Sequence, residues 1–145
     1  MKVVIQRCKK SHVEVNGEIV GQISNGMNLL VCLEKEDTES TVNMAVTKIG
    51  KLRIFEDLET GKMNQDISQA GGAFLAISQF TLSWDGRKGN RPSFDLSMGP
   101  EQANNLFQIF CEKLSAYAEV QQGVFAADMQ VHIQNDGPVT FVLNF

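Results

Sequence analysis

The chain has 145 residues, of which 43% are hydrophobic and 21% are charged, and its formal net charge is −4. This balance is that of an ordinary globular domain, and a chain of this length buries about two-thirds of the surface that its unfolded form exposes. The net negative charge argues against a protein whose whole surface attracts nucleic acid or membranes. We therefore expect one compact domain over residues 1–145.

No segment is typical of a signal peptide or of a membrane span. Lys2 is followed by VVIQRC, an apolar run too short for the hydrophobic part of a signal peptide. Nothing in the sequence approaches the roughly 20 consecutive apolar residues that a membrane helix needs. We expect a cytoplasmic protein without a membrane partner.

The cysteines and histidines are not spaced like metal ligands or disulfide partners. Cys8, Cys32 and Cys111 are odd in number and far apart, which argues against a disulfide framework or a zinc site. His12 and His132 each alternate with apolar neighbours, and neither has another potential ligand at a useful spacing. The sequence predicts no metal site and no cofactor.

The first half of the chain is expected to contain short strands and one helix. Residues 1–24 predict two strands joined at Asn16-Gly17, the strongest short hairpin signal, and residues 27–34 predict a third strand. Asp37 or Thr38 can cap the helix that follows. Residues 53–57 are strand-like, and residues 57–72 form a polar excursion. The apolar positions of the helix are Val42, Ala45, Val46, Ile49 and Leu52.

The second half begins with a strand over residues 73–82, in which residues 74–77 place apolar groups on both faces. Residues 83–99 predict an irregular, locally basic loop, and Pro100 fits the first turn of a second helix. Residues 129–134 and 139–145 predict two final strands. The helix has an apolar stripe of Ala103, Leu106, Phe107, Phe110, Leu114 and Tyr117. The order ββ-βα-βα-βββ predicts an α/β fold, with a mixed β-sheet and two main helices packed on one side of it.

Two short segments do not fit this plan as simply. Ser78, Gln79 and Thr81 interrupt the apolar strand, and burying such groups unpaired costs roughly 1–3 kcal/mol each. They must face a cleft, unless Ser78 and Thr81 merely cap the strand end through local hydrogen bonds. The segment NDGPVT, residues 135–140, consists of turn-forming residues and predicts a hairpin turn. Neither segment contains a Ser-His-Asp pattern or a nucleophile elbow.

Together, SQFTL (78–82) and NDGPVT (135–140) resemble the two motifs of the D-aminoacyl-tRNA deacylase family, also called D-tyrosyl-tRNA deacylases. The likeness spans the whole chain and includes VIQR, KLRIFED, GKMNQ, QAGG, RPSF and GVFAADMQV. Cys32 departs from the family, which usually has glycine there. We expect Cys32 to lie away from both motifs, so that it puts only local packing in doubt.

The resemblance implies a homodimer that hydrolyses the ester between a D-amino acid and the 3′-terminal adenosine of tRNA. Ser78, Gln79, Phe80 and Thr81 would form the catalytic floor, where unpaired backbone N–H groups at residues 79–81 stabilise the developing oxyanion. Two routes are open for the attack. Thr81 is a possible nucleophile but has no visible base, and the favoured route has the tRNA 2′-OH help to activate water.

The resemblance also gives the second motif a role. Gly137 and Pro138, joined by a cis bond, would enter the partner subunit's active site and present two carbonyls to the substrate's α-amino group. An L-side chain would clash with this turn, whereas glycine would escape, so that glycyl-tRNA mischarged on tRNA-Ala is also an expected substrate. Arg7 would hold the turn in place.

The tRNA contact is the least defined part of the site. The aminoacylated 3′ end must meet a local basic patch on an acidic protein, and Arg87, Lys88 and Arg91 are the candidates, although a merely solvated loop is the alternative. A non-catalytic nucleic-acid-binding module on the same scaffold is a second possibility, but it would not need intact motifs. A third is the animal sister deacylase that removes L-alanine, whose strand motif differs from SQFTL.

Overall fold

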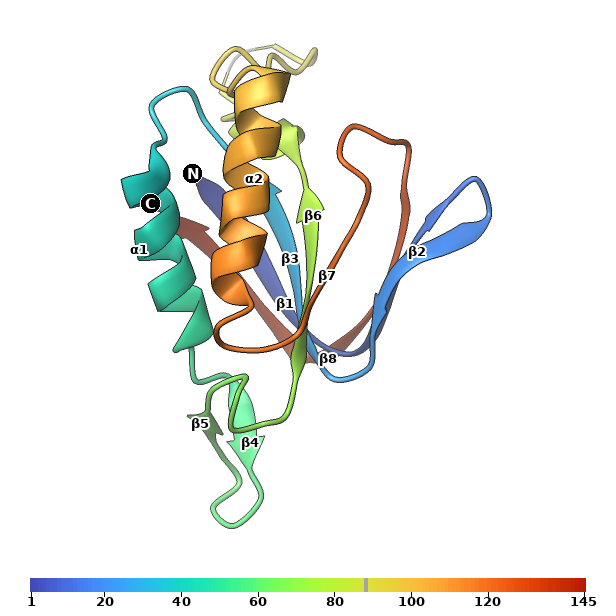
Figure 1. Cartoon of the computed structure of the whole chain (residues 1–145), viewed down its shortest axis with the longest axis vertical. Coiled ribbons are helices and arrows are strands. Elements are labelled where there is room, and N and C mark those ends of the chain that lie inside the picture. Colours follow the sequence, from blue (N-terminus) through green and yellow to red (C-terminus); the bar gives the residue numbers. More distant parts are fainter. Residues whose placement is uncertain (88) are drawn as a thin grey trace.

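The structure, a computed structural model, describes residues 1–87 and 89–145. Helices α1 (Glu39–Gly50) and α2 (Pro100–Leu114) lie side by side on one face of a mixed sheet (Figure 1). The sheet has the order β2-β1-β3-β6-β7, and β8 pairs with β1. The predicted α/β class is confirmed. The strands are β1 (Lys2–Val15), β2 (Glu18–Ile23), β3 (Gly26–Cys32), β4 (Phe55–Asp57), β5 (Lys62–Gln65), β6 (Ala73–Ser78), β7 (Val120–Gln122) and β8 (Gln130–Asn144), and a 3₁₀ helix, η1, covers Phe80–Ser83.

The hairpin at the start of the chain forms where the sequence predicts it. Asn16 and Gly17 have φ angles of 52° and 82°. Both therefore adopt the left-handed conformation that a two-residue type I′ turn requires, and Asn and Gly tolerate it best. Val15 pairs directly with Glu18 across this turn. The turn fixes the register of β1 against β2.

Strand β6 is buried on both faces, as its apolar run predicts. Phe74 and Ala76 belong to the main core between the sheet and the two helices. Leu75 and Ile77 belong to a second apolar cluster, which β1, β2 and β8 form on the other face. The register of β1 shifts against β2 and β8, and such bulges bend a strand. The bent strands curl over the second face of β6 and give the sheet a barrel-like shape.

The two helices cover the main core. Before α1, the Thr38 N–H donates to Thr41 Oγ1 at 3.2 Å, so Thr38 is the capping residue. The helices are tied together by Lys113, whose Nζ lies 2.8 Å from both Glu39 Oε1 and Asn43 Oδ1. The buried residues are Val42, Ala45, Val46, Ile49 and Gly50 of α1 and Ala103, Phe107, Phe110, Cys111 and Leu114 of α2.

The predicted final hairpin is wrong. Residues 130–144 form the single strand β8, which pairs antiparallel with β1 along nearly its whole length. The Gly137-Pro138 segment lies within β8, and there the pairing with β1 shifts register between Gln6 and Cys8. The same turn-forming residues therefore distort a continuous strand and do not reverse its direction.

Shorter features also differ from the sequence predictions. The polar excursion contains β5, which pairs with β4, and β7 lies in a stretch where no strand was expected. Strand β6 ends at Ser78 and not at residue 82, and Tyr117 lies beyond the end of α2. Strands of three or four residues are too short to show an alternating pattern of apolar and polar residues.

The cysteines are free and buried. Burial raises the pKa of the Cys8 and Cys32 thiols to about 11, and that of the Cys111 thiol to about 12. All three are therefore neutral thiols near neutral pH. No helix in residues 1–87 or 89–145 is long and apolar enough to cross a membrane.

We expect these thiols to resist alkylation in the folded protein. Iodoacetamide at pH 8 should label all three only after unfolding in guanidinium, since the thiolate is the reactive form. A raised pKa also means that the folded state holds these protons more tightly. The resulting contribution to the free energy of unfolding is fully present below about pH 8.5, the ordinary thiol pKa. It is lost as the pH rises toward 11.

Urea unfolding at pH 8 and pH 10.5 measures this effect. Cys111→Ala is the matched variant, because it should lose less free energy of unfolding between the two pH values than the wild type does. Labelling of the folded protein at the rate of a free thiol would contradict the prediction.

Candidate active site

The first motif forms the point at which β6 ends. The Gln79 N–H still pairs with β3, since it donates to Val31 O at 2.7 Å. The chain then turns into η1, so it leaves the sheet after Gln79. The Gln79 side-chain amide donates to Thr81 Oγ1 at 2.6 Å. The polar side chains that interrupt the apolar run thus lie at the end of the strand.

A cavity of about 660 Å³ opens at this strand end. Phe80 stands at its rim, 56% exposed, and meets the ring of Phe94 edge-on at a centroid distance of 4.9 Å. The wall includes Ser78, Gln79 and Phe80 but not Thr81. The other lining residues are Val31, Leu33, Ile77, Phe94, Ser97, Met98, Gly99, Pro100, Ala103, Phe125, Ala126, Ala127, Met129 and Val131.

The chemistry of this wall is unusual for a catalytic site, because none of the lining residues that the structure describes is ionisable. The polar groups are two serine hydroxyls, the Gln79 amide and backbone. In the part of the chain that the structure describes, the N–H groups of Phe80 and Thr81 have no hydrogen-bond acceptor. Gln79 does not share this property, so the expected set of free donors shrinks from residues 79–81 to residues 80 and 81. Two adjacent free N–H groups are suited to bind a carbonyl oxygen or an oxyanion.

Cys32 lies next to the first motif, so the expectation that it lies away from both motifs is wrong. Its Sγ lies 3.5 Å from Phe80 O and can donate a weak hydrogen bond to it. Because the pKa of this thiol is raised to about 11, mainly by burial, it is a neutral packing group and not a nucleophile. Strand alternation alone could not show that the end of β3 reaches η1.

The second motif is held by polar contacts from β1. The Gly137-Pro138 peptide bond is cis. Arg7 Nη1 donates to Ile54 O at 2.6 Å, and Arg7 Nε lies 3.1 Å from Asp136 Oδ2. Asn135 Nδ2 donates to Val139 O at 3.1 Å, and this hydrogen bond spans the Gly137-Pro138 segment. Arg7 thus contacts this segment through its ion pair with Asp136.

One chain does not bring the two motifs together around the cavity. The lining residues come from β3 and Leu33, from β6, Gln79 and η1, from residues 94–99 and the start of α2, and from residues 125–131, and none comes from residues 135–140. A second hollow of about 790 Å³ lies along the outer side of α1 and includes Lys48, Lys51 and Arg53. It contains no residue of either motif.

The basic loop leads to the cavity wall. Arg87 and Arg91 are exposed, and Arg87 Nε lies 3.8 Å from Asp85 Oδ2. Lys88 lies outside the described residues. The loop continues to Phe94, which contacts Phe80. The sequence did not single out the apolar wall residues Phe125 and Met129, because they come from the irregular segment that precedes β8.

The fold is shared with solved structures. The chain superposes on the c-Myc DNA unwinding element binding protein with a TM-score of 0.95 and 40% identity, over 100% of this chain and 99% of that one. A structure described as a probable eukaryotic D-amino acid tRNA deacylase matches with a TM-score of 0.82 and 17% identity, covering 98% and 97% of the two chains. The second match supports the fold alone.

The sequence defines the class of protein. Relatives named D-aminoacyl-tRNA deacylase are 51% identical in Persephonella marina and 50% identical in Clostridium tetani, each over 99% of this chain and 97% of the relative. The chain is a hydrolase of the deacylase class. Residues 4–144 match the family described as D-Tyr-tRNA(Tyr) deacylase, and the chain belongs to this family. The family and the enzyme class predicted from the two motifs are confirmed.

We expect Gly137→Ala to destabilise the protein markedly. Gly137 has a φ of +125°, and an added Cβ would lie 2.7 Å from Val139 Cγ2 and 3.2 Å from Arg7 Nη2. Such backbone strain costs about 1–3 kcal/mol before the steric clash is added. Gly71→Ala is the matched control, since Gly71 also has a positive φ but no atom within 4 Å of its added Cβ. Urea unfolding should show the larger loss for Gly137→Ala, and equal losses would show that the clash is relieved.

Proposed function

We propose that the protein hydrolyses the ester bond of D-aminoacyl-tRNA and releases the free D-amino acid and the tRNA. The observation that carries the proposal is the position of the SQFTL motif, with two free N–H groups at the mouth of a cavity, in a chain that matches the family over residues 4–144. This hydrolysis removes D-amino acids from tRNA before they can be used in translation. We place it in the cytoplasm, where aminoacylated tRNA is found.

The proposed chemistry uses the backbone as its main catalyst. The N–H groups of Phe80 and Thr81 bind the ester carbonyl and stabilise the charge that develops on its oxygen. Thr81 is a weak nucleophile unless a base activates it. Its hydroxyl accepts a hydrogen bond from the Gln79 amide, which cannot take up a proton, and no ionisable side chain of residues 1–87 or 89–145 lines the cavity. The terminal 2′-OH of the tRNA therefore assists the attacking water.

Selection against L-amino acids is assigned to Gly137 and Pro138 of a second subunit. Their carbonyls receive the α-amino group of the substrate, and an L-side chain clashes with the segment. Glycine has no side chain to clash, so glycyl-tRNA mischarged on tRNA-Ala is also hydrolysed. Support comes from the separation of the two motifs within one chain and from the contacts that hold Gly137 beside Arg7.

The arrangement requires an isologous homodimer, in which each chain supplies one motif to each of two active sites at the interface. Among the described strands, β8 pairs only with β1. One edge of a 15-residue strand is thus available to another chain. The tRNA backbone is assigned to Arg87, Lys88 and Arg91, of which Arg87 and Arg91 are exposed in the structure.

We expect hydrolysis of D-aminoacyl-tRNA and glycyl-tRNA to be at least about 100-fold faster than that of the L-form, because a steric clash rejects more strongly than attraction selects. The test is release of labelled amino acid from matched D-, L- and glycyl-tRNA, with and without EDTA. The chelator should leave the rate unchanged, since no step uses a metal. Binding of nucleic acid without ester hydrolysis would instead favour a non-catalytic module.

The role of Thr81 separates the two routes of attack. Thr81→Ala should retain measurable turnover, whereas a substrate with a 2′-deoxy terminal adenosine should lose about 100-fold or more, the contribution typical of general acid–base catalysis. Single-turnover rates measure both changes, and Ser97→Ala provides a control by removing a hydroxyl from the cavity wall. A covalent aminoacyl ester trapped on Thr81 would show that Thr81 is the nucleophile.

A further inference from the structure

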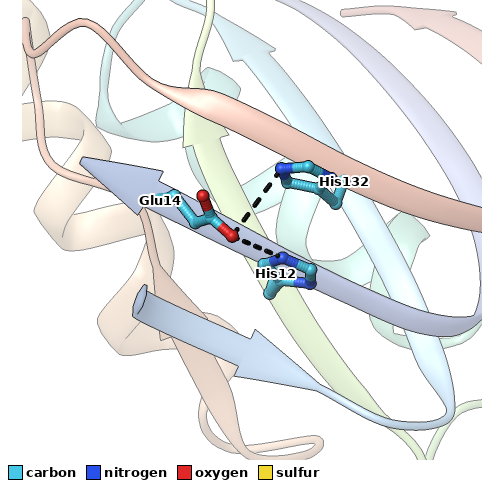
Figure 2. Close-up of side chains that lie close together, drawn as sticks. All are labelled: His12, Glu14 and His132. Carbon is cyan, nitrogen blue, oxygen red and sulfur yellow. Dashed lines mark hydrogen bonds and ion pairs between the residues drawn. The ribbon is translucent and has the colours of Figure 1, made fainter. Parts of the chain in front are cut away.

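A second group of chemically active side chains lies on β1 and β8, outside the cavity. His12, Glu14 and His132 point toward one another (Figure 2). His12 and Glu14 are two residues apart on β1, so they share one face of the strand. His132 is the direct partner of His12 in the register of β8. The adjacent residues Val13 and Val131 face the second apolar cluster, so the group lies on the outer face.

The three side chains bring their ligand atoms close together. Glu14 Oε1 lies 3.1 Å from His12 Nε2 and 3.8 Å from His132 Nε2, and one ligand atom from each residue lies within 4.8 Å of the others. In a tetrahedral zinc site, bonds of about 2.0–2.2 Å place neighbouring ligand atoms about 3.3 Å apart. The two measured distances lie on either side of that value.

The imidazole rings stack at a centroid distance of 4.4 Å with an angle of 7° between their planes. Parallel rings direct their nitrogen lone pairs side by side, so one ring must turn for both to meet one ion. His132 has room to turn, since its side chain is 53% exposed. The backbone beneath is fixed, because β1 pairs with β2 and β8 at His12.

The surroundings favour a cation. Gln22 and Gln130 lie opposite His12 and Glu14 on the neighbouring strands, so both flanking partners are neutral amides. In residues 1–87 and 89–145, the Glu14 carboxylate has no lysine or arginine within ion-pair distance, only the two histidines. A carboxylate and two neutral imidazoles form a ligand set with one negative charge.

We propose that His12, Glu14 and His132 bind a divalent transition-metal ion, with Zn²⁺ as the preferred occupant. Two imidazoles and one carboxylate are a known zinc ligand set, and solvent supplies the fourth ligand. Ca²⁺ and Mg²⁺ prefer oxygen ligands and do not fit. The ion joins β8 to β1 beyond the register shifts of their pairing. It stabilises this part of the sheet and does not take part in ester hydrolysis.

The test titrates Zn²⁺ into the untagged, EDTA-dialysed full chain by calorimetry at pH 7.5. We expect one ion per chain and a rise in Tm with zinc. His132→Gln and Glu14→Gln should each weaken binding at least tenfold. Lys10→Gln is the matched control, since Lys10 lies two residues from His12 on the same strand but belongs to no ligand set.

The chain contains only two histidines, so their ring ¹⁵N signals report on this site alone. This measurement uses the wild-type protein, so it does not depend on how well a variant folds. Zinc should shift both sets of ring signals in the wild-type protein. Absence of binding at 1 mM Zn²⁺, or stoichiometric binding that persists in His12→Gln/His132→Gln, would overturn the proposal. Deacylase activity should not change with zinc, which keeps this test separate from that of the proposed function.

Discussion

The burial of β6 on both faces is the constraint on which the rest of the structure depends. Phe74 and Ala76 are buried beneath the two helices, and Leu75 and Ile77 are buried beneath the curled strands on the other side. A strand enclosed in this way can carry polar groups only where it ends. The cavity therefore opens at Ser78, and the bulges of β1 that cover the second face also bring Val131 of β8 into the cavity wall.

Features set by neighbouring residues could be predicted from the sequence. The Asn16-Gly17 turn, the apolar stripes of both helices and the run in β6 are local patterns. The Gly-Pro segment could not be assigned, because the same residues suit a hairpin turn and a distortion within a strand. Pairings between distant segments also carry no local signal, as with Cys32 beside Phe80 or His12 opposite His132.

The candidate site, too, could be predicted from the sequence only in part. The sequence motifs located Ser78, Gln79 and Phe80 in the cavity wall, and Arg7 beside Gly137. They did not show that the Gln79 N–H is already paired, nor that Thr81 is outside the wall. Both facts depend on where β6 stops, and the boundary between a strand and a 3₁₀ turn is set by contacts with Val31 and Cys32.

None of the described residues that line the cavity is ionisable, which has a consequence for the range of amino acids that the proposed mechanism can serve. In that mechanism, backbone donors contact the ester, and backbone carbonyls of the second motif contact the α-amino group. The ester and the α-amino group are common to every aminoacyl-tRNA, whatever the side chain. The proposed mechanism therefore distinguishes the configuration at the α-carbon and not the identity of the side chain. By this mechanism, a single protein acts on charged, polar and aromatic D-residues alike.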